Sequence, residues 1–147
     1  MKRFQGRTVV AGHGKGPALI TDQAVNFTAA FTKIPNMFPS RRAEVRDRHH
    51  PLFKVNMKGR VLILPACIGS THTGLVLLDL VRLKNGPAAI IVERADPLLV
   101  SGVLLSQVWY HQSVPIVEYG THALQDEVRD GQMIEVNGET GEILVAD

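Results

Sequence analysis

Residues 61–93 read VLILPACIGSTHTGLVLLDLVRLKNGPAAIIVE, and they carry the clearest structural signal in the chain. The run VLILP at 61–65 is continuously apolar, which is typical of a strand covered on both faces. The leucines and valines of residues 75–83 suit a buried helix, and Asn85-Gly86 follows as a stop signal. AAIIVE at 88–93 has the composition of a second buried strand. The stretch therefore predicts a strand–helix–strand unit.

A second unit of the same kind follows towards the C-terminus. Asp96 is expected to cap a helix that has Pro97 at its first position and runs to about Trp109. VPIVEY at 114–119 then predicts a third strand. Two successive units imply a parallel, right-handed core. Residues 131–147 predict a hairpin of two alternating strands around an Asn-Gly turn.

The first third of the chain predicts β structure before a long irregular segment. RTVVAG at 7–12, PALITD at 17–22 and AVNFTAAF at 24–31 are rich in apolar and β-branched residues. GHGKG at 12–16 is interpreted as a connection, because it lacks the spacing of a phosphate-binding loop. Residues 32–54 form a loop of the length that is usually functional or mobile. The predicted fold class is α/β, with a mixed, barrel-like β-sheet in one domain over residues 1–147.

Composition narrows the classes of function. The 147 residues are 45% hydrophobic with a net charge of +2, which suits one compact core and no nucleic-acid partner. No apolar run reaches the roughly 20 residues of a membrane span, and the polar start favours a cytoplasmic protein. Cys67, the one cysteine, cannot hold an iron–sulfur cluster or a zinc ion alone. Its simplest interpretation is a small buried residue at the end of a strand.

The loop between the first buried strand and its helix is the candidate for chemistry. Free backbone N–H groups and the helix dipole at such a helix start favour a carboxylate, a phosphate or a developing alkoxide. Ser70 could act as a base only with such help. The plainer interpretation makes Thr71 or Thr73 an N-cap. His72 is a general base, a phosphate acceptor or an exposed loop histidine.

At this point the sequence resembles the small subunit of aconitase X, over about two-thirds of the chain. The pieces that carry the resemblance keep a common order and spacing. They are Asp47-Arg48-His49-His50-Pro51, Lys58-Gly59-Arg60-Val61-Leu62, Gly69-Ser70-Thr71, Gly86-Pro87-Ala88-Ala89-Ile90-Ile91, Asp96-Pro97-Leu98, Val114-Pro115-Ile116-Val117 and Gly131-Gln132.

The resemblance implies an aconitase-like swivelling domain and a hydro-lyase that dehydrates a small, anionic hydroxy-carboxylate. It implies a larger partner subunit, in a heterodimer, that carries an iron–sulfur cluster, while this chain binds no cofactor or metal itself. Ser70 matches the family's catalytic serine, and Gly69 and Thr71 would shape the anion-binding loop. His72 is a candidate for substrate contact, and Asp47 and His50 are peripheral substrate-binding candidates. Activities known in the family include dehydration of a phosphorylated mevalonate and of a hydroxylated proline.

Two departures from the family pattern keep other functions open. Phe27-Thr28-Ala29-Ala30-Phe31 stands where the family has a Gly-Gly-Val-Asp-like turn. Cys67-Ile68-Gly69 replaces Gly-Arg-Gly, so the arginine beside the serine is absent. These departures favour the first alternative, a non-catalytic ligand-binding or regulatory module on the same fold.

The second alternative is a phosphohistidine swivelling domain, which residues 114–145 also resemble. The place of the acceptor histidine in that family corresponds here to residues 95–102, which contain no histidine. The loop arginines Arg41, Arg42, Arg46 and Arg48 either meet an anionic substrate or form an exposed charged surface.

Overall fold

A computed structural model describes residues 1–68 and 72–147, with the side chains of residues 34 and 35 excepted. The strands are β1 Lys2–Gln5, β2 Arg7–Val10, β3 His13–Ile20, β4 Val61–Leu64, β5 Ala89–Val92, β6 Ile116–Glu118, β7 Met133–Asn137 and β8 Glu142–Val145. The α-helices are α1 Phe27–Phe31, α2 Thr73–Arg82, α3 Pro97–Tyr110 and α4 Thr121–Gln125, and η1 Ile34–Met37 is a 3₁₀ helix.

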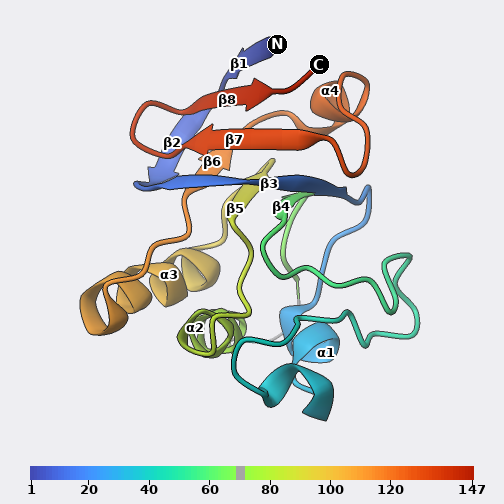
Figure 1. The fold of residues 1–147 in the computed structure, drawn as a ribbon, viewed down its shortest axis with the longest axis vertical. Coiled ribbons are helices and arrows are strands. Elements are labelled where there is room, and N and C mark those ends of the chain that lie inside the picture. Colours follow the sequence, from blue (N-terminus) through green and yellow to red (C-terminus); the bar gives the residue numbers. More distant parts are fainter. Residues whose placement is uncertain (69–71) are drawn as a thin grey trace.

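The eight strands form one mixed sheet in the order β1-β8-β7-β3-β4-β5-β6-β2 (Figure 1). Strands β3 to β6 are mutually parallel, and the other pairs are antiparallel. β1 and β2 lie at opposite edges although only Gly6 separates them in the sequence. The sheet is therefore strongly curled but does not close. The predicted parallel units, mixed sheet and C-terminal hairpin are confirmed.

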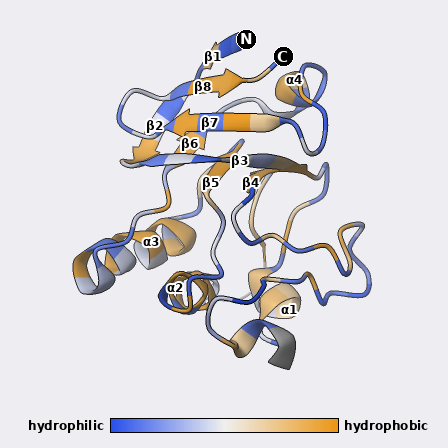
Figure 2. Cartoon of the chain, in the orientation of Figure 1, coloured by the Kyte–Doolittle hydropathy of each residue, from blue (hydrophilic) through white to orange (hydrophobic). Residues whose placement is uncertain are grey.

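Strands β4 and β5 are buried on both faces, which explains their continuous apolar runs. In β4, Leu62 and Leu64 face a core shared with the helices. Val61 and Ile63 face a second core, closed by the antiparallel strands and α4. Helices α1, α2 and α3 lie together on one side of the parallel strands, and the antiparallel strands β7 and β8 lie on the other (Figure 1). Hydrophobic residues accordingly follow the strands and the inner sides of the helices (Figure 2).

The start of α3 has the N-cap and the first helical residue that the sequence predicts. Asp96 has an extended backbone, and its Oδ1 accepts a hydrogen bond of 2.7 Å from the N–H of Leu98. Pro97 occupies the first helical position, where a missing N–H costs nothing. Helix α2 ends at Arg82, and Lys84 takes a left-handed φ of 62° just before Asn85. Both predicted helices are confirmed.

Two predictions for the N-terminal third are wrong. AVNFTAAF contains helix α1, not a strand, because the Asn26 side chain caps it by accepting a 3.2 Å hydrogen bond from the N–H of Ala29. The segment GHGKG is not a connection, since residues 13–16 belong to β3. Helix α4 was not anticipated from the sequence. Among the described residues, no helix is both long and apolar enough to cross a membrane.

Candidate functional site

The centre of the predicted loop, Gly69, Ser70 and Thr71, lies outside the described residues, but both of its flanks are defined. On one side Cys67 pairs with Val25, and the N–H of Ile68 donates a 3.0 Å hydrogen bond to the Val25 carbonyl. On the other side, His72 precedes α2 and its carbonyl accepts 2.9 Å from the N–H of Val76. The loop therefore joins the carboxyl end of β4 to the start of α2, as the sequence predicts.

Helix α2 holds His72 in place because its first turn is packed against α3. Thr73 and Gly74 are buried. A Cβ added at Gly74 would lie 2.4 Å from the carbonyl oxygen of Leu98, so the two backbones meet directly. The His72 side chain itself is exposed. The interpretation of His72 as a surface loop histidine agrees with this exposure, and its predicted contact with substrate stays a prediction.

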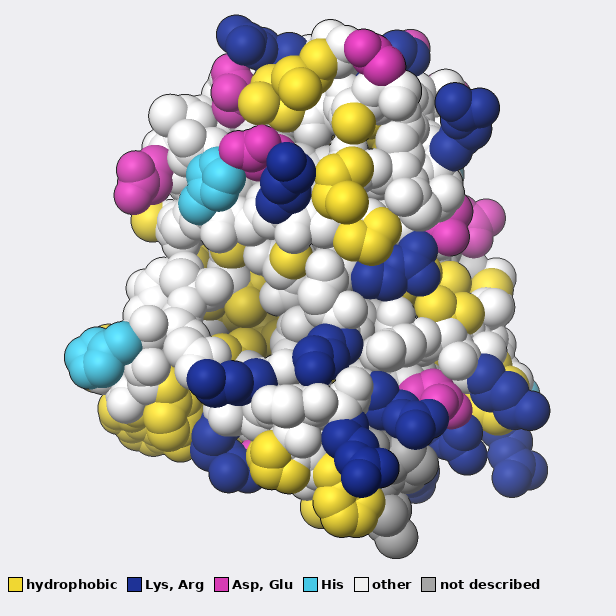
Figure 3. Space-filling view, viewed as in Figure 1, with side chains coloured by type: hydrophobic (Ala, Val, Ile, Leu, Met, Phe, Trp, Pro, Cys, Tyr) yellow, Lys and Arg dark blue, Asp and Glu magenta, His cyan; other side chains and the backbone are white. Residues whose placement is uncertain are grey.

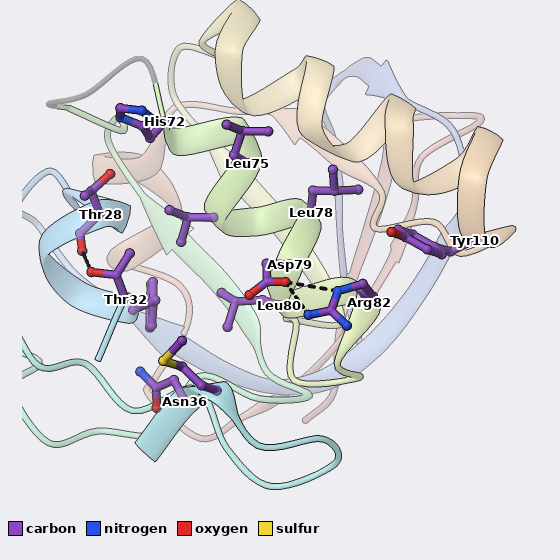
Figure 4. A pocket seen from close by; sticks show the side chains of 13 residues that line it. Thr28, Thr32, Asn36, His72, Leu75, Leu78, Asp79, Leu80, Arg82 and Tyr110 are labelled. Atoms are coloured by element: carbon purple, nitrogen blue, oxygen red, sulfur yellow. Dashed lines mark hydrogen bonds and ion pairs between the residues drawn. The ribbon is translucent and has the colours of Figure 1, made fainter. Parts of the chain in front are cut away.

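His72 stands at the rim of a pocket of about 480 Å³ between α1, η1, α2 and the end of α3 (Figure 4). Most of the exposed surface of the lining is apolar. The apolar side chains are Phe31, Met37, Leu75, Val76, Leu78 and Leu80. The polar side chains and Tyr110 are spread around them: Thr28, Thr32, Asn36, His72, Asp79, Arg82 and Tyr110.

Most polar groups of the pocket already have partners within the chain. Buried Asn36 donates 2.7 Å to the Glu44 carbonyl and accepts 2.7 Å from the Glu44 N–H. Asp79 pairs with Arg82 at 2.6 Å and raises the pKa of that guanidinium. The Thr28 hydroxyl is buried and has no hydrogen-bond partner within the described part of the chain. The pocket thus offers a mostly apolar surface edged by polar side chains, which suits a small, mostly apolar molecule with polar ends.

Asp47 and His50 lie apart from this pocket's lining, in a turn of the long loop. The N–H of His50 donates 3.2 Å to the Asp47 carbonyl, and His50 Nδ1 accepts 3.0 Å from the N–H of Leu52. His50 Nε2 is buried without a hydrogen-bond partner among the described residues. Asp47 Oδ1 accepts 3.1 Å from the N–H of His49. These bonds account for the Asp-x-x-His pattern as a local turn, and the predicted role in substrate binding stays a prediction.

Two of the loop arginines are engaged with a carboxylate. Arg42 and Arg46 both pair with Glu44, and the hydrogen bond from Arg46 is the main cause that lowers the pKa of Glu44. Arg41 lies over the ring of Phe38, 5.8 Å from its centroid. An anionic substrate would have to compete with Glu44 for Arg42 and Arg46. The structure therefore favours the interpretation of these two as part of a charged surface.

The described residues do not fit an iron–sulfur cluster. No three His, Cys, Asp or Glu side chains come together in this part of the chain to hold a metal ion. Cys67 is buried, and its burial raises the pKa of the thiol to about 12, so the sulfur stays protonated at neutral pH. The interpretation of Cys67 as a small buried residue near a strand end agrees with the structure.

Sequence reasoning missed the walls of the pocket that come from α1 and η1. Thr28 and Asn36 belong to segments without helical periodicity, and Asn36 is held by the backbone of Glu44, eight residues further along the chain. One local signal was available: asparagine commonly caps helices, and the side chain of Asn26 can accept a hydrogen bond from the N–H three residues later, at Ala29. The position of Asn36 had no comparable signal, because Glu44 holds it through backbone atoms.

Comparison with protein families matches residues 3–145 to the aconitase X swivel domain. The phosphomevalonate dehydratase small subunit of Methanothermobacter thermautotrophicus is 27% identical over 137 residues, which cover 93% of this chain and 95% of that protein. The cis-3-hydroxy-L-proline dehydratase of Pseudomonas aeruginosa is 34% identical over 114 residues. The match covers 78% of this chain but only 18% of that longer protein.

Solved structures agree on the fold. The crystal structure of Thermococcus kodakaraensis aconitase X in its holo-form superposes with a TM-score of 0.82 at 21% identity, and the match covers 100% of both chains. A 3-isopropylmalate dehydratase from Methanocaldococcus jannaschii gives a TM-score of 0.57 at 15% identity, over 92% of this chain and 82% of that one. These likenesses establish a swivel-domain fold.

Proposed function

The chain belongs to the aconitase X swivel domain family, and we propose that it is the small subunit of a dehydratase whose active site is completed by a larger partner. The observation that carries the proposal is the family match over residues 3–145 together with relatives that are named dehydratases or dehydratase small subunits. On this proposal residues 1–147 act as one swivelling domain, in the cytoplasm, that closes over a shared site.

Ser70 is the proposed base. As an alkoxide it would accept the proton from the carbon next to a substrate carboxylate, while hydroxide departs from the neighbouring carbon. The proton and the hydroxide together account for the water that is eliminated. Gly69 and Thr71, which precede α2 in the sequence, are proposed to shape an anion-binding loop that favours the negative charge of the alkoxide or of the carboxylate.

The pocket beside His72 supports a site at this end of α2. Its apolar surface suits the carbon skeleton of a small hydroxy-carboxylate, and His72 at the rim is a proposed contact for an anionic end. Asp47 and His50 would take part only if the substrate or the partner extends past this pocket. A phosphorylated mevalonate and a hydroxylated proline both remain candidate substrates.

The iron–sulfur cluster is assigned to the partner. Since the described residues bring no metal-binding group of side chains together, a cluster in the assembled enzyme would take its ligands from the larger subunit. The lone cysteine, protonated and buried, fits this division.

The test is anaerobic co-purification of the tagged chain, with iron analysis and turnover assays on both candidate substrates. We expect a larger, iron-containing partner at equal stoichiometry, and turnover that is lost in Ser70→Ala and retained in the surface control Thr8→Ala. Turnover retained in Ser70→Ala would remove this serine from the mechanism. A chain that is recovered alone and without iron would favour the non-catalytic ligand-binding module.

A further inference from the structure

We propose that the outer face of α3 is the surface on which the larger subunit docks, an inference that rests on the function proposed above. This surface, called the α3 face, consists of Leu98, Leu104, Val108 and Trp109. Their exposed fractions are 38%, 46%, 70% and 58%. Large apolar side chains that are exposed together on one element mark an interaction site more often than isolated ones do.

The composition of α3 is the first argument. Its sequence PLLVSGVLLSQVWY holds no charged residue in 14 positions. A helix that is apolar on all sides is ordinarily buried on all sides, since exposed apolar area gains nothing in water. Here only Leu99, Gly102, Val103 and Ser106 are buried. The helix carries more apolar surface than this chain covers, so another body is expected to cover it.

The position of the α3 face is the second argument, because it continues into the candidate site. Tyr110, the last residue of α3, is 37% exposed and lines the pocket beside Arg82. Its ring lies 6.5 Å from that of Trp109, measured between centroids. Leu75, 57% exposed, extends the apolar surface along α2 to His72. A partner seated on the α3 face would therefore reach over the pocket.

The relatives indicate what this partner is. In Pseudomonas aeruginosa cis-3-hydroxy-L-proline dehydratase the matching segment is 18% of one longer chain, whereas the small subunit from Methanothermobacter thermautotrophicus is matched over 95% of its length. Where the domain is a separate chain, it has to bind the remainder of the enzyme through its own surface. Interfaces of such permanent complexes are more apolar than those of transient ones. The α3 face has this character.

The charges around the site predict the chemistry of the opposing surface. Residues 33–60 contain eight Lys or Arg against two acidic residues, while the whole chain has a net charge of only +2. Figure 3 shows the Lys and Arg side chains gathered over the lower part of the molecule, beside the hydrophobic patch at the lower left, where Figure 1 places α3. Complementary potentials orient partners as they meet. We expect the large subunit to present an apolar groove flanked by acidic side chains.

A stable complex would need to cover only a small part of the surface of this chain. An interface of standard size takes about 800 Å² from each partner, about a tenth of a small protein's surface. The accessible surface of this chain is 7374 Å², so about a ninth of it would be covered in such a complex. The four side chains of the α3 face, with Leu75 and Tyr110, would form its central, desolvated part.

The experiment uses the purified chain and a purified probe: the protein from the same source that aligns with the remainder of the Pseudomonas dehydratase, outside the matched 114 residues. Leu104→Glu and Val108→Glu place a carboxylate in the α3 face. Met133→Glu is the matched control, since Met133 is 41% exposed on β7 in the antiparallel half of the sheet. Dissociation constants are measured by biolayer interferometry, after thermal melts have shown that all variants fold.

We expect each α3 variant to bind the probe at least tenfold more weakly, and the control to bind as the unmodified chain does. Equal binding by the α3 variants would overturn the docking surface and leave the proposed function standing. Failure of the unmodified chain to bind the probe would overturn the proposed function itself. Two further measurements test the other possible occupants of the α3 face. Self-association in sedimentation that Val108→Glu abolishes would assign the face to a second copy of the chain. Flotation with phosphatidylcholine vesicles that Val108→Glu abolishes would assign it to a membrane.

Discussion

Helices α2 and α3 cover the same side of the sheet and meet at Gly74 and Gly102. They differ in burial, because the more apolar helix, α3, buries the smaller share of its residues. Helix α2 includes Asp79 and Arg82 and buries seven of its ten residues. Helix α3 has no charged residue and buries only four of fourteen. The core of this chain explains most apolar side chains of α2. It leaves several apolar side chains of α3, such as Val108, unexplained.

The difference separates two roles that hydrophobic residues can have. Side chains of α2 such as Leu77 stabilise the folded chain, because they leave water when it folds. Side chains of α3 such as Val108 stay in water after folding and gain free energy only when a partner covers them. Mutations in α2 should therefore lower the stability of the chain, whereas mutations on the exposed side of α3 should weaken the binding of a partner.

The largest effect is expected from Leu77→Ala. Leu77 is fully buried under the sheet, and removing its side chain should lower the free energy of unfolding by about 3 kcal/mol. The matched variant Leu104→Ala, at a position 46% exposed, should cost about 0.5 kcal/mol. Urea unfolding followed by circular dichroism measures both. Equal losses would end the distinction between the two helices.

The contact between the helices gives the next effect. A Cβ at Gly102 would lie 2.2 Å from the Gly74 carbonyl oxygen, so Gly102→Ala forces α2 and α3 apart. Overpacking of this kind costs about 1–3 kcal/mol, more than offsetting the better helix propensity of alanine. Gly120→Ala is the control, since nothing lies within 4 Å of its added Cβ. A Gly102→Ala protein as stable as this control would contradict the close approach.

How far the sequence predicts this architecture depends on whether a signal is local. Asp96 and Pro97 predict the start of α3 because cap and first turn are neighbours in the sequence. Gly14 and Gly16 mislead, since glycines are typical of turns. Here they lie in a strand, where a Cβ at Gly14 would meet the Ala88 carbonyl oxygen at 2.0 Å. That reason lies in a segment far along the chain, which no local pattern reveals.

The candidate site divides in the same way. The arrangement of β4, the loop up to His72 and helix α2 was predictable from an apolar run and a helix start. The opposite wall of the pocket was not, because Asn36 is held by Glu44 and η1 is joined to the end of α2 by the buried Asn85 side chain, which donates 2.8 Å to the Phe38 carbonyl. Which side of α3 stays exposed was also hidden, since no charged residue of α3 marks an outer side.

Cys67 precedes α2, and the charge of Asp96, which precedes α3, acts on its thiol. This thiol predicts that the stability of the folded chain depends on pH. Burial, and secondly the charge of Asp96, raise the pKa of its thiol from 9.0 to about 12. Between these values the folded chain keeps a proton that the unfolded chain releases, so stability falls as pH rises above 9. We expect a loss of about 1 kcal/mol between pH 8 and pH 10 that Cys67→Ala lacks. Chemical denaturation at each pH measures it, and parallel curves for the two proteins would refute it.

The smallest effect separates the two contributions of Asp96. Asp96→Ala removes the cap of α3 and should cost about 1 kcal/mol, because the N–H of Leu98 loses its partner. Asp96→Asn keeps an acceptor at that position and should cost much less, but it removes the charge that acts on Cys67. In Asp96→Asn the alkaline loss should therefore level off at a lower pH than in the unmodified chain. If the two variants are equally destabilised near pH 7, the charge of Asp96 and not its capping bond supports α3. The start of that helix would then depend on electrostatics, while its outer face would still be left for a partner.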